Sequence, residues 1–160
     1  MRKLFKLAGL LAMTGILVSC SNEKTTANYQ VIPLPQEITA ESGDEFVLNN
    51  GTEIVYPGGN EKMQRNAQYL AEYLKKATGA EYKIVAGTKG KGNILLQLGL
   101  SAEKPEAYQL KVTSDGVTIS GASEAGVFYG IQTLRKSIPV VMNSNPVLAA
   151  VEINDYPRFD

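Results

Sequence analysis

The sequence predicts an α+β domain in which two helices pack on one face of a mostly antiparallel sheet. Two segments, 61–78 and 123–138, have apolar residues at helical spacing. The short runs around them alternate between apolar and polar residues, as strands do when only one of their faces is buried. Helices that cover one face of such a sheet form an α+β sandwich.

The first helix, 61–78, is the most clearly marked element. Asn60 is expected to cap its start, and Gly79 to end it in the left-handed conformation that glycine adopts readily. Its last turn carries two lysines, which suit the negative end of the helix dipole. Its apolar stripe consists of Met63, Ala67, Leu70, Leu74 and Ala77.

The second helix is predicted to start after Ser123, a good N-cap, and to end before Pro139. Gly126 and Gly130 each weaken a helix by about 1 kcal/mol relative to alanine. Such a loss is reasonable if the bare backbone lies close against the sheet. The apolar stripe consists of Val127, Phe128, Ile131, Leu134 and Ile138.

Turn residues separate the predicted strands. The segment 49–51 (NNG) should turn the chain between two strands, because Asn and Gly tolerate positive φ. Residues 108–121 are predicted to form a hairpin that turns at Asp115 and Gly116. The other strands are expected at 37–41, 45–48, 52–56, 81–85, 93–98 and 147–153.

The loop at 87–92 (GTKGKG) is rich in glycine and lysine, which raises the possibility of a phosphate site. It lacks the spacing of a P-loop, and it leads into the strand 93–98 instead of a helix. We therefore predict a mobile hairpin loop here.

The first 19 residues predict a secretory signal. Arg2, Lys3 and Lys6 precede an uncharged run at 7–19. This run is shorter than the roughly 20 apolar residues that a spanning helix needs, which argues against a permanent membrane helix. The signal ends in the sequence LVSC, which resembles the lipobox of bacterial lipoproteins. Residues 1–19 are therefore predicted to be removed and Cys20 to carry a lipid.

A lipid on Cys20 would fix the mature protein to a membrane surface. The alternative, a buried free cysteine, does not suit a position with no foldable segment around it. Residues 20–30 are predicted to be a flexible polar tether, and the domain should start near Val31. The residues after Cys20 lack the aspartate associated with inner-membrane retention. We therefore expect the outer membrane of a Gram-negative bacterium.

The composition excludes several kinds of chemistry. Cys20 is the only cysteine and the chain has no histidine, so Ser/His/Asp or Cys/His catalysis and ordinary zinc sites are excluded within it. Three of the 16 basic residues lie in the signal, which leaves 13 against 16 acidic residues and a net charge of −3. Nucleic-acid binding therefore has no electrostatic support.

Catalysis without histidine would depend on carboxylates, and three close pairs are available: Asp44 with Glu45, Glu103 with Glu106, and Glu152 with Asp155. Neither spacing nor an apolar setting distinguishes any pair from solvated loop charge. Tyrosines at 69, 73 and 82 offer a sugar-stacking platform or, more ordinarily, helix packing. No residue of this chain is therefore predicted to be catalytic, and no metal or cofactor is expected.

Residues 106–135, and above all the run AGVFYGIQTL at 125–134, resemble the N-terminal domain of family 20 glycoside hydrolases, the β-N-acetylhexosaminidases. Segments at 31–36, 70–74 and 153–159 match in the same order. The resemblance implies an accessory domain at 31–152 and a junction at 153–160, followed by a catalytic (β/α)8 barrel that this sequence lacks.

For a complete protein, the resemblance implies release of terminal N-acetylhexosamine from glycans with retention, the substrate's own acetamido oxygen acting as nucleophile. The Asp-Glu pair and the sugar-lining tryptophans of that barrel have no counterpart in this chain, which contains no tryptophan. A fragment that is inactive alone is therefore expected. Two alternatives stay open: a complete, lipid-anchored glycan-binding module, and the accessory domain of an O-GlcNAcase-like or α-glucuronidase enzyme.

Overall fold

The computed structural model describes residues 25–158. The signal predicted for 1–19 and the lipid site predicted at Cys20 lie outside this range. The described residues contain two helices, α1 (Glu61–Thr78) and α2 (Glu124–Ser137). They also contain the strands β1 (Glu37–Ala40), β2 (Phe46–Val47), β3 (Ile54–Tyr56), β4 (Ile84–Ala86), β5 (Asn93–Leu98), β6 (Tyr108–Thr113), β7 (Gly116–Gly121), β8 (Val147–Leu148) and β9 (Val151–Asp155).

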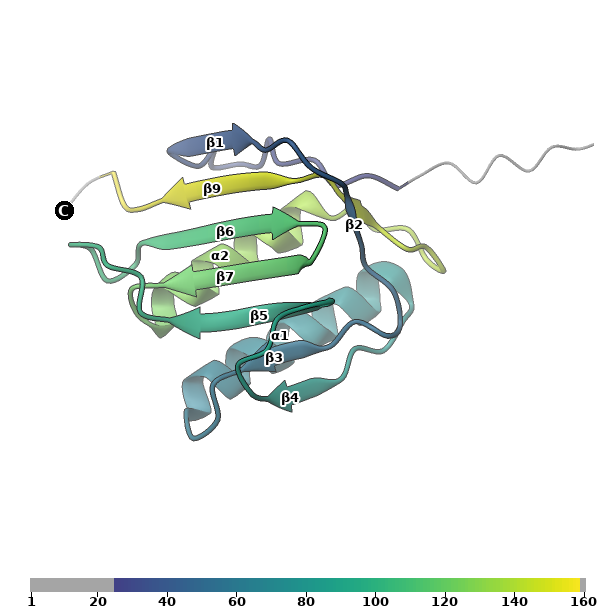
Figure 1. Cartoon of the computed structure of the whole chain (residues 1–160), viewed down its shortest axis with the longest axis horizontal. Helices are drawn as coiled ribbons and strands as arrows, with labels where there is room; N and C mark the ends of the chain where they lie inside the picture. The colour runs from purple at the N-terminus through teal and green to yellow at the C-terminus, as the bar shows by residue number, and fades with distance from the viewer. Residues whose placement is uncertain (1–24, 159–160) are drawn as a thin grey trace, which may run out of the picture.

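Seven of the described strands form one sheet in the order β1-β9-β6-β7-β5-β3-β4, and β2 pairs separately with β8. The half from β1 to β7 is antiparallel, whereas β7, β5, β3 and β4 pair in parallel. Both helices cover the same face, with α2 over β5–β7 and α1 over β3 (Figure 1). The α+β fold with two helices on one face is therefore confirmed. Part of the sheet is parallel because α1 connects β3 to β4. The helix carries the chain back to the end of the sheet at which β3 begins, so β4 runs in the same direction as β3.

Local signals set the helix ends as predicted. The Asn60 side chain accepts hydrogen bonds from the backbone N–H groups of Lys62 and Met63, and Gly79 ends α1 at φ 80°. The Ser123 side chain caps α2 in the same way. Between the helices and the sheet lies a core whose largest fully buried side chains include Ile54, Met63, Leu70, Leu74, Ile94, Leu96, Leu110, Ile119, Ile131 and Leu134.

The two helical glycines lie close against the sheet, as expected. A Cβ on Gly126 would lie 2.3 Å from the carbonyl oxygen of Ala107. A Cβ on Gly130 would lie 2.5 Å from Ile119 Cγ2. The bare backbone at these positions is therefore what lets α2 approach β6 and β7.

The hairpin predicted around residues 87–92 is wrong. Strands β4 and β5 do not pair with each other, because β3 lies between them and pairs in parallel with both. The loop between them crosses β3 on the sheet face away from the helices, where Gly87 lies against Val55 and Gly90 against Leu95. This crossing explains the glycines, since side chains there would meet the sheet.

One turn prediction is confirmed and one strand prediction needs correction. The turn at 49–51 lies between β2 and β3 as predicted, with Thr52 N–H donating to Asn49 O at 3.0 Å. The two strands it joins belong to different sheets. The single strand predicted at 147–153 is divided into β8, which pairs with β2, and β9, which lies between β1 and β6.

The predicted tether is wrong for residues 25–30. Val147 N–H donates to Thr25 O, Ala27 N–H to Val147 O, and the Tyr29 hydroxyl to Ala149 O at 2.9 Å. Burial raises the pKa of the Tyr29 hydroxyl. These residues therefore form part of the folded domain, and its start lies before Val31. At the other end, β9 extends to Asp155, so residues 153–155 belong to the sheet and not to a junction.

Candidate functional site

The carboxylate pair at the end of the domain is divided between the two faces of β9. Glu152 accepts a hydrogen bond from Lys111 Nζ at 2.9 Å on the face away from the helices, which holds the pKa of Glu152 below its usual range. Asp155 lies on the helix face, where it accepts from the Tyr108 hydroxyl at 3.3 Å. The two groups therefore do not form an acid–base pair.

The other carboxylates also lack the setting of a catalytic pair. Glu103 is exposed, whereas Glu106 is half-buried at the edge of a groove. Asp44 and Glu45 lie exposed in the loop before β2. Among the described residues, no cluster of three or more cysteines, histidines or carboxylates could hold a metal ion.

The tyrosines of α1 join the helices instead of forming a platform. Tyr82 is buried in the core. The Tyr69 hydroxyl accepts from Arg135 Nη1 at 3.0 Å, and its ring lies 5.4 Å from that of Phe128 at an angle of 51°. The Arg135 guanidinium lies 5.2 Å from the centre of the Tyr73 ring. These contacts support the packing interpretation, because tilted and covered rings do not offer a flat surface to a sugar.

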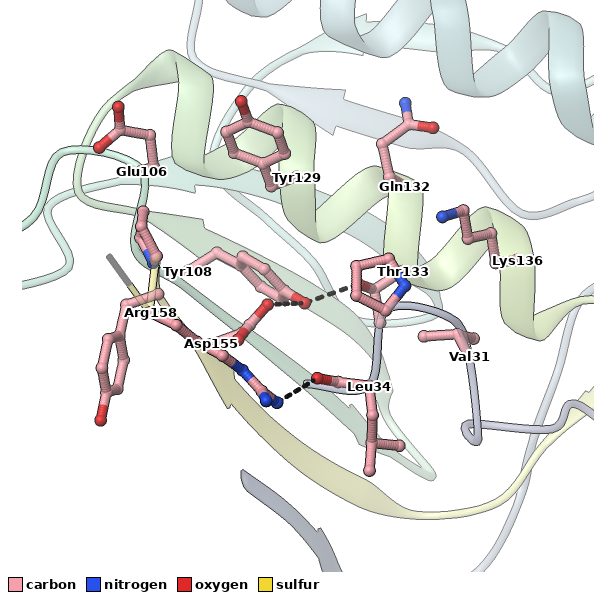
Figure 2. A pocket seen from close by; sticks show the side chains of 13 residues that line it. Val31, Leu34, Glu106, Tyr108, Tyr129, Gln132, Thr133, Lys136, Asp155 and Arg158 are labelled. Atoms are coloured by element: carbon pink, nitrogen blue, oxygen red, sulfur yellow. Dashed lines mark hydrogen bonds between the residues drawn. The ribbon is translucent and has the colours of Figure 1, made fainter. Parts of the chain in front are cut away.

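A groove lies between α2 and the end of β9. We call it the α2 groove; its volume is about 530 Å³. One wall is α2, and the other is made by two extended segments from opposite ends of the domain, 31–34 and 155–158 (Figure 2). Its lining residues are Val31, Pro33, Leu34, Glu106, Tyr108, Tyr129, Gln132, Thr133, Lys136, Asp155, Tyr156, Pro157 and Arg158.

Buried polar groups form the floor of the α2 groove. The hydroxyl of Tyr108 lies 2.6 Å from Thr133 Oγ1 and donates to Asp155 Oδ2 (Figure 2). Burial is the main cause that raises the pKa of the Tyr108 hydroxyl, so this group keeps its proton and acts as a donor. Asp155 Oδ1 also accepts from the backbone N–H of Gln36 at 3.1 Å. This network joins β6, β9, α2 and the segment before β1.

The side chains of a lysine and an arginine hold the segment 31–34 by hydrogen bonds to its backbone. Lys136 Nζ donates to Ile32 O at 2.7 Å. Arg158 Nη2 donates to Leu34 O at 3.0 Å (Figure 2). These bonds bind the start of the domain to α2 and to the segment after β9. The groove is therefore a fixed shape whose walls come from distant parts of the chain.

The rim of the α2 groove is apolar and open to solvent. Leu34, Tyr129 and Tyr156 are 49%, 48% and 47% exposed. Tyr129 also lines a second hollow between the first turns of α1 and α2, beside the exposed Phe128. A groove with an apolar rim and a neutral phenol on its floor suits the binding of apolar side chains.

Sequence reasoning did not predict the α2 groove. Both of its extended segments are named in the sequence analysis, one as the start of the domain and the other as a junction, but no local pattern indicates that they touch. A usable signal was present: each segment combines apolar residues with prolines, which suit chain laid along a surface.

We predict that Thr133→Val lowers the free energy of unfolding by about 1–3 kcal/mol, because the shape is kept while the buried Tyr108 hydroxyl loses its 2.6 Å partner. Urea unfolding followed by circular dichroism measures this loss. Thr113→Val is the matched control, since Thr113 is only half-buried at the end of β6, and we expect a change within about 0.5 kcal/mol. Equal effects of the two substitutions would contradict the role of the hydroxyl pair.

A family model described as "Glycosyl hydrolase family 20, domain 2" matches residues 28–156, which is nearly the whole described chain. The chain belongs to glycosyl hydrolase family 20. It corresponds to the accessory, non-catalytic domain 2 of that family. The family match includes residues 28–30, in agreement with their packing against the domain.

Relatives in family 20 are named as hexosaminidases. The chain is 36% identical over 138 residues to a β-hexosaminidase of Porphyromonas gingivalis, which covers 81% of this chain and 17% of that protein. It is 29% identical over 132 residues to a β-N-acetylhexosaminidase of Cellulomonas fimi, and the match covers 81% of this chain and 26% of that protein. The structure of a family 20 β-N-acetylhexosaminidase from Streptomyces coelicolor superposes with a TM-score of 0.72 at 30% identity. The superposition covers 81% of this chain and 27% of that protein. The chain thus spans about a quarter or less of the length of these relatives.

Proposed function

We propose that this chain is the N-terminal domain of a membrane-anchored exo-β-N-acetylhexosaminidase, and that the α2 groove packs against the catalytic domain of the same polypeptide. The family match supports a domain of a hexosaminidase, and the lipobox-like sequence that ends in Cys20 supports the anchor. The second part rests on one observation: the groove has an exposed apolar rim, and residues 155–158, which would lead into the catalytic domain, form one of its walls. Apolar surface of this kind is stabilised when another domain covers it.

In the complete enzyme, the catalytic domain would remove terminal N-acetylhexosamine from glycans. The substrate acetamido oxygen would attack, and an Asp-Glu pair of that domain would orient it and transfer the proton. This chain corresponds to domain 2 of the family, and its role would be to support the catalytic domain. A lipid on Cys20 would hold the enzyme at the cell envelope, by our expectation at the outer membrane.

The expected result is that the purified chain alone does not hydrolyse 4-nitrophenyl N-acetyl-β-glucosaminide above the buffer rate. Sequencing the gene past codon 160 should show an open frame, and the longer polypeptide should be active. In that polypeptide, Leu34→Asp should lower the thermal midpoint, because a charge would be buried between domains. In the isolated chain the same substitution should have little effect, because Leu34 is half exposed there.

Val85→Asp is the control for the docking test, since Val85 is exposed on the edge strand β4, away from the groove. It should change neither protein by more than the usual surface effect of about 0.5 kcal/mol. Turnover by the chain alone would contradict the non-catalytic assignment. An equal effect of Leu34→Asp in both proteins would contradict docking at the α2 groove but not the family assignment.

A glycan-binding role is the second candidate, favoured by the exposed rings of Tyr129 and Tyr156 at the rim of the groove. Calorimetry of the chain with N-acetylglucosamine oligosaccharides tests it. Affinity that is lost in Tyr129→Ala would support this role, whereas no heat of binding would count against it.

A further inference from the structure

The loop between α2 and β8 presents an apolar tip to solvent. Val140, Val141 and Met142 are 67%, 43% and 59% exposed. No charged residue occurs between Lys136 and Glu152. Three consecutive exposed apolar residues are unusual on a protein surface unless they contact another phase or molecule.

The tip is held in place by bonds to the rest of the domain. Asn143 N–H donates to Thr78 O at 2.7 Å, at the end of α1, and Ser144 Oγ donates to Val141 O at 2.6 Å. Met142 Cε lies against Gly79, the C-cap of α1. The side chains on either side of the tip, Ile138 and Val147, are buried. The apolar tip is therefore presented by a fixed loop.

The same loop lies beside the point where the described chain begins. Thr25 and Ala27 both bond to the backbone of Val147, and the bridge between Thr26 and Val147 is parallel. Because the two segments run in the same direction, Thr25 lies toward the loop side of Val147. Figure 1 shows the loop and the start of the described chain at one end of the domain and the end of β9 at the other.

Only residues 21–24 separate Cys20 from Thr25. Fully extended, five residue steps span at most about 18 Å, so a lipid on Cys20 would keep the bilayer within that distance of Thr25. At such a short distance even a weak contact is strongly favoured, because the tether raises its effective concentration.

We propose that Val140, Val141 and Met142 insert into the interface of the bilayer that holds the Cys20 lipid, so that the domain has a second membrane contact. This inference rests on the lipid anchor of the proposed function. Two or more acyl chains already hold a protein stably, so the loop contributes mainly to orientation. With this end on the membrane, the opposite end, which carries residues 155–158, faces away from it, toward the space where glycans are found (Figure 1).

The chain offers a clean test because it has no tryptophan. The reporter is Val141→Trp, and the matched control is Leu98→Trp at the opposite end of the domain, where Leu98 is 38% exposed against 43% for Val141. The lipidated full chain is reconstituted in phosphatidylethanolamine and phosphatidylglycerol vesicles. We expect emission from position 141 to shift to shorter wavelength and to be quenched by doxyl-labelled lipid, and emission from position 98 to stay as in water.

Equal, water-like emission from both positions in lipidated chain would overturn the loop contact and leave the anchor intact. A short-wavelength emission from position 141 before vesicles are added would also overturn it, because protein would then cover the tip. Intact mass reports the lipid separately. If Cys20 carries none, the proposed contact with the bilayer that holds that lipid is overturned together with the anchor.

Discussion

Gly126→Ala should destabilise the domain by about 2–3 kcal/mol, toward the upper end of the range for overpacking. The new Cβ would lie 2.3 Å from the carbonyl oxygen of Ala107 and 3.2 Å from that of Pro105. Both obstacles are backbone atoms, which no change of rotamer can move. The gain in helix propensity, about 1 kcal/mol, is too small to offset the displacement of α2. Chemical denaturation of the mature chain measures the loss.

Two other glycines provide graded controls. At Gly130 the obstacles are the side chains of Ile119 and Tyr108, which can shift, so Gly130→Ala should have a smaller effect. At Gly58 the nearest atom would be Ala86 Cβ at 3.4 Å, an ordinary contact, and Gly58→Ala should be nearly neutral. If Gly126→Ala were as stable as the unchanged protein, the close approach of α2 to β6 would be wrong.

The same approach shapes the α2 groove. Ala107 directly precedes Tyr108, whose hydroxyl meets Thr133 of α2. Moving α2 away from Ala107 would lengthen this 2.6 Å contact and open the floor of the groove. In the longer polypeptide, Gly126→Ala should therefore also weaken the contact between domains.

The helices were predictable because their signals are local. Asn60 and Gly79 act on backbone groups within four residues of themselves, so the boundaries of α1 could be given from the sequence and match the structure. The close packing of Gly126 and Gly130 was predictable for a similar reason: glycine in an otherwise good helix needs a compensating contact.

Strand pairing was less predictable, because it is decided far along the chain. Glycines at 87–92 suit a hairpin and also suit a loop that crosses a strand at close range. Which of the two forms depends on β3, which enters the sheet between β4 and β5. Ile54 of β3 and its partner Ile84 of β4 are 30 positions apart in the chain. No local sequence pattern predicts the position of β3 between β4 and β5.

The α2 groove shows the same limit more strongly. Arg158 and Leu34 are 124 positions apart and touch through a single hydrogen bond. The lack of histidine could be read directly from the sequence. The groove itself required the three-dimensional contact between the two ends of the domain.

Cys20→Ser is expected to abolish lipidation and to leave residues 1–19 attached. The thioether to diacylglycerol needs the sulfur, and signal removal at a lipobox follows that modification. Each buried CH₂ of an acyl chain contributes about 0.8 kcal/mol, so losing two or more chains lowers membrane affinity by many orders of magnitude. Incorporation of a labelled fatty acid and the intact mass of the chain are the measurements.

The uncleaved signal could itself hold the chain at a membrane, so fractionation alone does not decide the matter; the acyl label and the mass do. Ser19→Ala is the matched control, since it keeps a small residue before the cysteine and should be processed normally. A label retained in Cys20→Ser would place the anchor elsewhere. It would then remove the reason for the apolar tip at 140–142 to lie near a bilayer, because only the short span from Cys20 to Thr25 brings the two together.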